Sequence, residues 1–322
     1  MPTALSQENR LCWMRQIEIR LYSQLTKKKI VFGGDSPSQL TISVKGAKYL
    51  SALKDKGTVA ISNLTYAQIT ELILGQYDDI EIWAGYRTQQ LQCYFKGAVS
   101  YISDKIYARR DNTCYILYAS KMVASYSKSR MNFNLNSGIN LYSAFNYICL
   151  TNGISPSHLP QSLRQEFLSE VTENYGTPAT LAEQLAANTS QFTIDTDPSI
   201  DGGGVINCTN IADKRQIRIN QDSINFTKGN PTLDKDGLHI TILPTFCFKP
   251  GDIIIIDNAI IDVSISDANQ VASTFKSNYL DSNGAYMVME VNYDFANREK
   301  TFEINLKCRA VSIIANVVGA KI

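Results

Sequence analysis

The first part of the chain alternates apolar and polar residues with a period of two. The segment Gln16–Ser23 reads "QIEIRLYS", and it places Ile17, Ile19 and Leu21 on one side of an extended chain. The alternation returns in "QLTISVKG" and "TVAISNL". A period of two is typical of strands that bury one face. The pattern therefore predicts a β-rich domain over residues 14–128.

One short helix interrupts these strands. Thr65 and Gln68 have the spacing of a capping box, in which each side chain binds the backbone amide of the other residue. Gly75 fits the left-handed residue that ends many helices. Three apolar positions share one face of the predicted helix: Ile69, Leu72 and Ile73. A helix is thus expected between two strands of the sheet.

The middle of the chain changes to helical spacing, which predicts a helical connecting segment over residues 129–190. A second helix is expected to open at Pro160, where the missing amide hydrogen costs nothing. A third is expected to begin at Thr177–Pro178. The apolar stripes of the three helices are Leu141, Phe145, Ile148 and Cys149, then Leu163, Phe167 and Val171, then Leu181 and Leu185.

Strand patterns return over residues 191–316, which predicts a second β-rich domain. Its segments "PGDIIIIDNA" and "YMVMEVNYDF" resemble the earlier pair "YDDIEIWAGY" and "YFKGAVSYIS". In each pair an acidic residue leads a strand and an aromatic-rich strand follows. Two copies of one small β-barrel would explain this weak internal repeat.

Composition limits the classes of function. The chain has 322 residues, with 44% hydrophobic and 19% charged residues, so it can build a substantial core. A formal net charge of +1 argues against a strongly electrostatic nucleic-acid or membrane-surface binder. The seven cysteines are scattered and form no CxxC pair, which indicates reduced, buried thiols. No apolar run is long enough to span a bilayer, so no membrane insertion is expected.

Motifs that carry chemistry are weak throughout. "GGDSPS" lacks the second glycine of a nucleophile elbow and has a proline directly after its first serine. "TLDKDG" lacks the carboxylates of a calcium loop. His158 and His239 have no metal-ligand spacing, and Asp78 and Asp79 would point to opposite faces of a strand. The sequence therefore predicts no catalytic residues, no cofactor and no metal site, and no enzyme activity.

Trp83 and Tyr86 are the best candidates for a contact surface. Trp83 is one of two tryptophans in the chain, and it lies in the strand-like segment "IEIWAGY". Core packing explains such residues most simply. A subunit interface is the next interpretation, because aromatic residues are enriched in interfaces, and a small-ligand site is the third.

The order of these elements resembles the baseplate hub proteins of contractile-tailed bacteriophages. The resemblance is carried by "TVAISNLTYAQITELILGQYDDIEIWAGY" with "YFKGAVSYI", by "GNPTLDKDGLHITILPTFCFKPGDIIII", and by the closing "NGAYMVMEVNYDFANREKTFEINLKC". It covers about residues 15 to 312. Where the family usually has "LLP", this chain has Ile242, Leu243 and Pro244.

The resemblance implies a β-rich α+β fold made of two tail-tube-like β-barrel domains, with short inserted helices and the helical middle segment. It also implies a homotrimer that joins a six-fold tail tube to a three-fold central spike. Three chains with two similar barrels each would present six barrels to the tube. The expected partners are a second and third copy of the chain, the tail spike protein, the tail tube protein, other baseplate proteins and the tape measure protein. DNA would pass transiently through the central channel.

The expected location is the baseplate of the virion tail, after assembly in the host cytoplasm. Two alternatives stay open. One is the hub of a phage-derived contractile injection system, such as a tailocin. The other is a peptidoglycan-degrading or ligand-binding β-rich tail component, which would need a paired acid or a metal cluster in a cleft.

Overall fold

The structure is a computed structural model, and it shows a mostly β chain with two helices of nine or more residues among its described elements. It describes residues 3–4, 15–34, 40–49, 55–87, 89–107, 112–120, 131–151, 155–159, 161–165, 167–168, 172–176, 181, 185, 192–197, 205–210, 214–219, 229–234, 236–263 and 280–311.

The first half of the main sheet is built from seven strands and follows the period of two. The inward positions of the first long strand, Ile17, Ile19 and Leu21, are all buried, as the alternation predicts. The strands lie in the order β4-β5-β8-β7-β6-β2-β3. Their bounds are β2 (Arg15–Tyr22), β3 (Lys29–Gly33), β4 (Thr41–Tyr49), β5 (Lys56–Ser62), β6 (Asp79–Tyr86), β7 (Gln92–Tyr107) and β8 (Asn112–Ser120).

The second half of the main sheet is formed mostly by strands from the part of the chain after residue 190, where the sequence pattern predicts strands again. Five of its strands lie in the order β15-β16-β20-β19-β17, β18 extends one end, and β14 and then β1 extend the other. Their bounds are β1 (Thr3–Ala4), β14 (Gln216–Ile219), β15 (Thr232–Asp234), β16 (Gly237–Ile242), β17 (Ile253–Ile256), β18 (Asp262–Val263), β19 (Ala285–Ala296) and β20 (Phe302–Ala310). A 3-10 helix, η5 (Asn258–Ile260), follows β17.

Five strands of each half repeat one topology. In sequence order β4, β5, β6, β7 and β8 match β15, β16, β17, β19 and β20, and both sets have the same neighbours. The backbone amide of Val99 donates to the carbonyl of Asp78 at 2.8 Å, and that of Val288 donates to the carbonyl of Asp252 at 2.8 Å. The register shifts directly after Val99 and after Val288. The internal repeat suggested by the sequence is therefore present in the strand order and in the position of a β-bulge.

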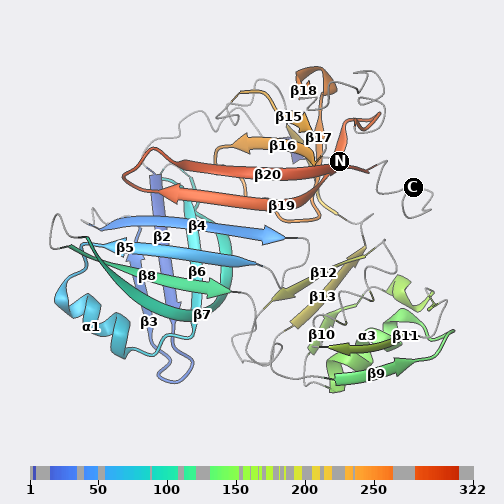
Figure 1. Cartoon of the computed structure of the whole chain (residues 1–322), viewed down its shortest axis with the longest axis horizontal. Coiled ribbons are helices and arrows are strands. Elements are labelled where there is room, and N and C mark those ends of the chain that lie inside the picture. Colours follow the sequence, from blue (N-terminus) through green and yellow to red (C-terminus); the bar gives the residue numbers. More distant parts are fainter. Residues whose placement is uncertain are drawn as a thin grey trace.

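A ladder between β4 and β19 joins the two halves into one 15-stranded sheet. It pairs Ser43 with Ala296 at one end and Tyr49 with Glu290 at the other. Figure 1 shows β20, β19, β4 and β5 side by side, with β2 and β6 crossing behind them. The predicted boundaries at 14–128, 129–190 and 191–316, and the closure of each half into a barrel, stay predictions.

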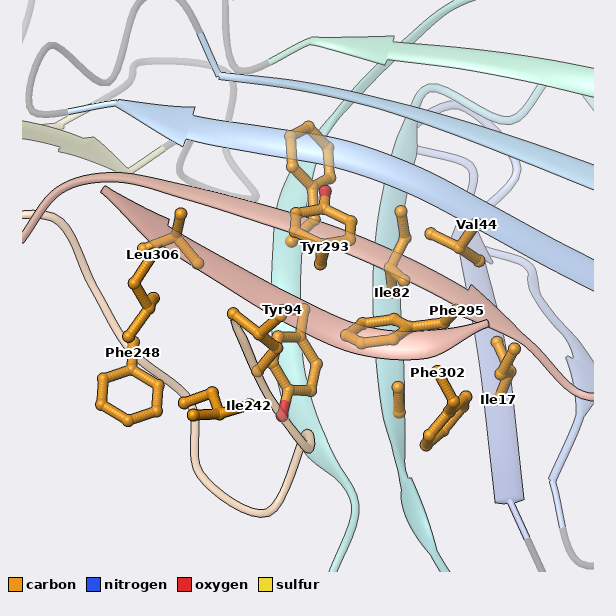
Figure 2. Close-up of a cluster of buried hydrophobic side chains, with 14 of the residues drawn as sticks. Ile17, Val44, Ile82, Tyr94, Ile242, Phe248, Tyr293, Phe295, Phe302 and Leu306 are labelled. Atoms are coloured by element: carbon orange, nitrogen blue, oxygen red, sulfur yellow. The ribbon is translucent and has the colours of Figure 1, made fainter. Parts of the chain in front are cut away.

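One hydrophobic core serves both halves. Figure 2 shows Tyr293 and Phe295 of β19 among side chains that come from both halves, including Ile82 of β6. The ring of Phe295 lies 4.7 Å from that of Tyr94 and 5.2 Å from that of Phe302, so aromatic contacts cross from one half to the other. Burying these rings together stabilises the pairing of the halves as well as each half.

The helix α1 (Tyr66–Leu74) forms where the capping box predicts it. The Gln68 amide donates to the Thr65 hydroxyl at 3.3 Å, and the Gln68 side chain accepts from the Thr65 amide at 2.9 Å. Gly75 is not left-handed, since its φ is −72°. A Cβ there would lie 2.3 Å from the Tyr77 ring, so the glycine is required by close packing. Gln76 takes the left-handed conformation instead, with a φ of 49°.

The middle segment contains strands as well as helices. The predicted first helix is α3 (Leu141–Thr151), and its stripe packs into a second hydrophobic core. Leu181 and Leu185 are helical and buried in the same core, while the remainder of that helix, and its predicted cap, lie outside the described residues. The strands of the middle segment are β9 (Met131–Leu135), β10 (Ser155–His158) and β11 (Thr172–Gly176), and β9 pairs with β11. β10 pairs with β13 (Val205–Asn210), which pairs with β12 (Phe192–Asp197), and both of these strands follow residue 190.

The helix predicted after Pro160 is wrong. Among the described residues of this segment the helical element is a 3-10 turn, η3 (Gln161–Arg164), and Val171 of the predicted stripe lies outside the described residues. Phe167 is exposed and pairs with Asn140 across an antiparallel bridge. The Leu168 amide donates to the carbonyl of Ile139 at 3.0 Å. Backbone pairing with residues 138–140 thus takes the groups that a continuing helix would have used.

Candidate subunit interface

Trp83 lies on the outer face of β6 in a cluster of charged side chains. Its register partner on β2 is Glu18, and Arg20 is two residues further along β2. The Arg20 guanidinium lies 4.2 Å from the centroid of the Trp83 ring, which is cation–π geometry. Arg20 also donates to Glu18. Trp83 is half-buried.

Glu81 is the centre of this cluster. Its carboxylate accepts from the Trp83 indole at 3.0 Å and from the Tyr22 hydroxyl at 3.2 Å. Lys96 of β7 places its ammonium 3.9 Å from the same carboxylate. Burial and the neighbouring Glu81 carboxylate raise the pKa of Tyr22, so its hydroxyl stays protonated and donates.

The cluster, which we call the Trp83 cluster, has the chemistry of a protein contact. Its residues are Glu18, Arg20, Tyr22, Glu81, Trp83 and Lys96. Two carboxylates face two cations, so the patch carries little net charge. Tryptophan, tyrosine and arginine dominate the binding energy of protein interfaces, especially when they are already held in place. The cluster can therefore bury its exposed aromatic surface without first desolvating an unpaired charge.

Tyr86 has a different environment from Trp83. Only 2% of its surface is exposed, and its ring meets that of Phe302 edge-on at 5.3 Å. Phe302 belongs to β20, so Tyr86 packs one half of the sheet against the other. Of the two residues singled out in the sequence, Trp83 has surface left for a partner and Tyr86 belongs to the core.

A second surface is the solvent face of β16, β20, β19 and β4, which we call the polar sheet face. Lys45 and Asp294 pair across the joint between the halves at 3.1 Å. The Thr241 hydroxyl donates to the Asn305 side chain at 2.7 Å. The face also carries Glu290, Asn292, Glu303 and Lys307. Its charges are of both signs and its amides and hydroxyls are neutral, so it presents a wet surface with no strong attraction for one sign of charge.

The helix α1 exposes apolar side chains that the sequence did not single out. Tyr66 and Leu74 are 85% and 72% exposed, and Ile73, predicted to face inward, is 56% exposed. Of the predicted inward stripe, Leu72 is fully buried. The middle of the helix contacts the turn after β2 through Lys28, whose ammonium is 3.8 Å from the Glu71 carboxylate. The sequence could have indicated this exposed apolar surface, because Tyr66 and Ile73 are spaced so that they fall on one side of the helix.

The residues considered for chemistry have structural partners. The carboxylates of Asp78 and Asp79 accept from the amide and the side chain of Gln24 at 3.0 and 3.1 Å. Asp234 lies in the β15–β16 hairpin, where its carboxylate is 3.3 Å from His239. Within the described part of the chain, no group of three or more His, Cys, Asp or Glu side chains could hold a metal ion. No described helix is long and apolar enough to cross a membrane.

The geometry can be compared with solved structures. The 43 kDa tail protein of prophage MuSo2 from Shewanella oneidensis aligns with a TM-score of 0.54 over 93% of this chain and 98% of its own. The tail protein from Neisseria meningitidis MC58 aligns with a TM-score of 0.54 over 94% of this chain and 98% of its own. The sequence identities are 7% and 9%. This chain has the fold of phage tail proteins.

A third similarity extends the comparison to secretion. The Escherichia coli c3393 protein aligns with a TM-score of 0.50 and 11% identity, over 87% of this chain and 76% of its own. It is described as a component of the type VI secretion system with structural similarity to the T4 tail proteins gp27 and gp5. No family model matches the chain, and no curated protein matches its sequence. The tail fold is thus recognisable from the arrangement of strands at identities near a tenth.

Proposed function

We propose that this protein is a structural component of a phage tail: the trimeric baseplate hub that joins the six-fold tube to the three-fold spike. In this role it binds two further copies of itself, the spike protein, the tube protein and other baseplate proteins. The tape measure protein and then DNA pass through the channel of the ring. The protein acts in the baseplate of the virion after assembly in the host cytoplasm.

The observation that carries this proposal is the repeated five-strand order within a chain of tail-protein fold. A ring of three chains would contain six copies of that five-strand unit. Such a ring can match a six-fold tube on one side and a three-fold spike on the other. Neither match requires a catalytic group.

Two surfaces suit the two tasks of a hub. The Trp83 cluster has the aromatic and arginine side chains of a contact between subunits. The polar sheet face, with its paired Lys45 and Asp294, suits the wall of a channel. A wall of paired charges and neutral amides would let a polyanion pass without binding it.

The oligomeric state tests the proposal. Size-exclusion chromatography with light scattering should give about three times the 35.9 kDa of one chain. Negative-stain electron microscopy should show rings with a central hole. The same measurements should be made after co-expression with the spike protein of the same tail, because some rings form only on their partner. A monomer under both conditions contradicts the hub.

The Trp83 cluster has its own test. Trp83→Ala should shift the trimer toward monomer while the circular dichroism of the chain stays unchanged, because the indole lies on the outer face of the sheet. Tyr101→Ala is the matched control, since Tyr101 is an exposed aromatic residue on β7, stacked on Tyr118. Equal assembly of the wild type and Trp83→Ala would remove Trp83 from the interface.

The similarity to c3393 supports a second role of the same class. A hub of a phage-derived contractile injection system would use the same ring and deliver a cargo other than DNA. Purified particles separate the two roles, because a virion contains packaged DNA and an injection system lacks a capsid. A lytic tail enzyme is tested by the turbidity of a peptidoglycan suspension, which should stay constant in the presence of this protein.

A further inference from the structure

Two cysteines from different halves of the sheet lie against each other. Cys93 is near the start of β7, and Cys247 is in the loop between β16 and β17. The thiol of Cys247 donates to the carbonyl oxygen of Cys93 itself at 3.1 Å. The thiol of Cys93 is turned toward its own strand and donates to the carbonyl of Phe95 at 3.4 Å. The two residues are 154 positions apart in the chain.

The pair differs from the other described cysteines in its access to solvent. Cys93 and Cys247 are both half-buried, whereas Cys114, Cys149 and Cys308 are buried. A small reagent can therefore reach this pair, while the other three are shielded by the sheet and by the second core. Reactivity of a thiol requires access as well as a favourable charge environment.

A lysine supplies that charge at the pair. The ammonium of Lys48 is 3.9 Å from the sulfur of Cys247 and 5.9 Å from the centroid of the Tyr94 ring. Burial raises the pKa of Cys93 to about 11, although Lys48 acts in the opposite direction. Cys247 is thus placed to react first and Cys93 second.

We propose that Cys93 and Cys247 are a modification site, at which a low-molecular-weight disulfide of the glutathione type converts two thiols into one disulfide between the halves of the sheet. The two sulfurs belong to the same small region, since one thiol already binds the backbone of the other residue. The cross-link itself does not depend on the proposed function. Its timing does, because a virion protein passes from a reducing cytoplasm to an oxidising exterior.

The chemistry balances with the small disulfide as the oxidant. The Cys247 thiolate attacks one sulfur of the reagent, the reagent's S–S bond breaks, and one small thiolate leaves. Cys93 then loses its proton to solvent and attacks the Cys247 sulfur of the mixed disulfide. The second small thiolate leaves and is protonated. Two protein thiols are oxidised to one disulfide, and one small disulfide is reduced to two small thiols.

The disulfide would add a covalent link between two halves that the strand pairing holds together by hydrogen bonds. Strand pairing between the halves runs through β4 and β19, while the disulfide would link β7 to the loop before β17. A cross-link that closes a long loop restricts the unfolded chain strongly. The oxidised protein should therefore resist separation of its halves better than the reduced protein does.

Peptide mapping tests the proposal on the intact protein. The folded chain is treated with oxidised glutathione, quenched with an alkylating agent at acidic pH and digested without reduction. Mass spectrometry should find the peptides of Cys93 and Cys247 joined and two hydrogens lighter than their sum. The thermal midpoint should rise by about 5 °C relative to the reduced protein. Recovery of both cysteines as alkylated or separately glutathionylated residues overturns the proposal.

Variants separate this pair from chance oxidation. Cys93→Ser and Cys247→Ser should each abolish the linked peptide, and Cys149→Ser should leave it unchanged as the matched control. Lys48→Gln should slow the first exchange step by about fivefold, because it removes the cation next to the Cys247 sulfur. An unchanged rate would overturn the assignment of Cys247 as the attacking thiol. Wild-type mapping decides the main question even if a serine variant does not fold.

Discussion

The two halves of the sheet share a strand order but differ in what fills it. Where β4 and β5 of the first half have Gly46 opposite Gly57, the equivalent strands of the second half have Leu233 opposite Leu238. The two glycines leave room for Tyr293, which reaches them from the second half. The first half is therefore shaped to receive a side chain from its counterpart, and the second half fills its own interior. Repetition of a topology does not require repetition of packing.

The strand-leading aspartates show the same divergence. Asp252 is buried, and its carboxylate accepts from the Lys249 amide at 2.7 Å and pairs with Arg215. Asp78, at the equivalent position, is exposed and accepts from the Gln24 amide at 3.0 Å. Asp252 therefore stabilises the loop before β17, whereas Asp78 is a solvent-exposed turn residue.

Replacing each of these two aspartates should show the largest difference in stability between equivalent positions of the two halves. Asp252→Asn removes the charge of a buried carboxylate that accepts from the Lys249 amide and pairs with Arg215. The free energy of unfolding should fall by about 2 to 3 kcal/mol. Asp78→Asn should lower it by less than about 1 kcal/mol, because water replaces the lost contact. Urea unfolding followed by circular dichroism measures both. Equal losses would show that burial of Asp252 has no energetic consequence.

The glycine pair gives the next largest expected effect. A Cβ at Gly46 would lie 2.1 Å from the Tyr293 hydroxyl, so Gly46→Ala should destabilise the chain by about 2 kcal/mol. Gly57→Ala is the matched control, since its nearest contacts would be 3.3 Å away. It should cost about 1 kcal/mol or less. Adding Tyr293→Leu to Gly46→Ala should restore part of the loss, which unfolding of the double variant in urea would show.

Two buried tyrosines should respond with opposite signs. The Tyr293 hydroxyl is buried and has no hydrogen-bond partner among the described residues, so Tyr293→Phe should leave stability unchanged or raise it by about 1 kcal/mol. The Tyr286 hydroxyl donates to Asn258 at 2.8 Å and accepts from the Asp281 amide. Tyr286→Phe should cost about 1 to 2 kcal/mol. Thermal unfolding of the two variants side by side checks the difference in sign.

The smallest effect concerns α1, which lies between β5 and β6. Among the described elements, the equivalent strands β16 and β17 have no helix between them. Thr65→Ala removes the cap of α1 and should cost about 1 kcal/mol. Thr70→Ala is the control, because Thr70 bonds within the exposed helix at 3.0 Å and caps nothing. Hydrogen exchange should show faster exchange of the amides of the first turn in Thr65→Ala alone. Identical protection in both variants would contradict the cap.

Local patterns in the sequence predicted the long strands of the main sheet and the helix α1 well. The period of two located β2 and β5 to within two residues, and the capping box located α1. These features depend on residues close in sequence, so a single sequence can reveal them. The antiparallel pair of β19 and β20, which lies in the closing segment quoted for the resemblance, is also formed by residues close in sequence.

Contacts between segments far apart in the chain could not be predicted from local sequence patterns. The pairing of β4 with β19, and the room that Gly46 makes for Tyr293, involve residues far apart in the chain. Phe167 followed a helical stripe in the sequence but pairs with Asn140. Trp83 is half-buried on an outer face of the sheet, and its contacts with Arg20 and Glu81 were not foreseen. The subunit contact itself stays a prediction.

The ladder between β4 and β19 also sets the order in which the chain can fold. The side chain of Asn297, at the end of this ladder, accepts from the amide of Ile42 across 255 residues of sequence. During synthesis the first half must wait, with one edge of β4 unpaired, until β19 has left the ribosome. Pairings of such high contact order form slowly, and an unpaired edge is a template for association with other chains. We therefore expect the yield of folded protein to rise at low expression rates and with chaperones that shield the nascent edge.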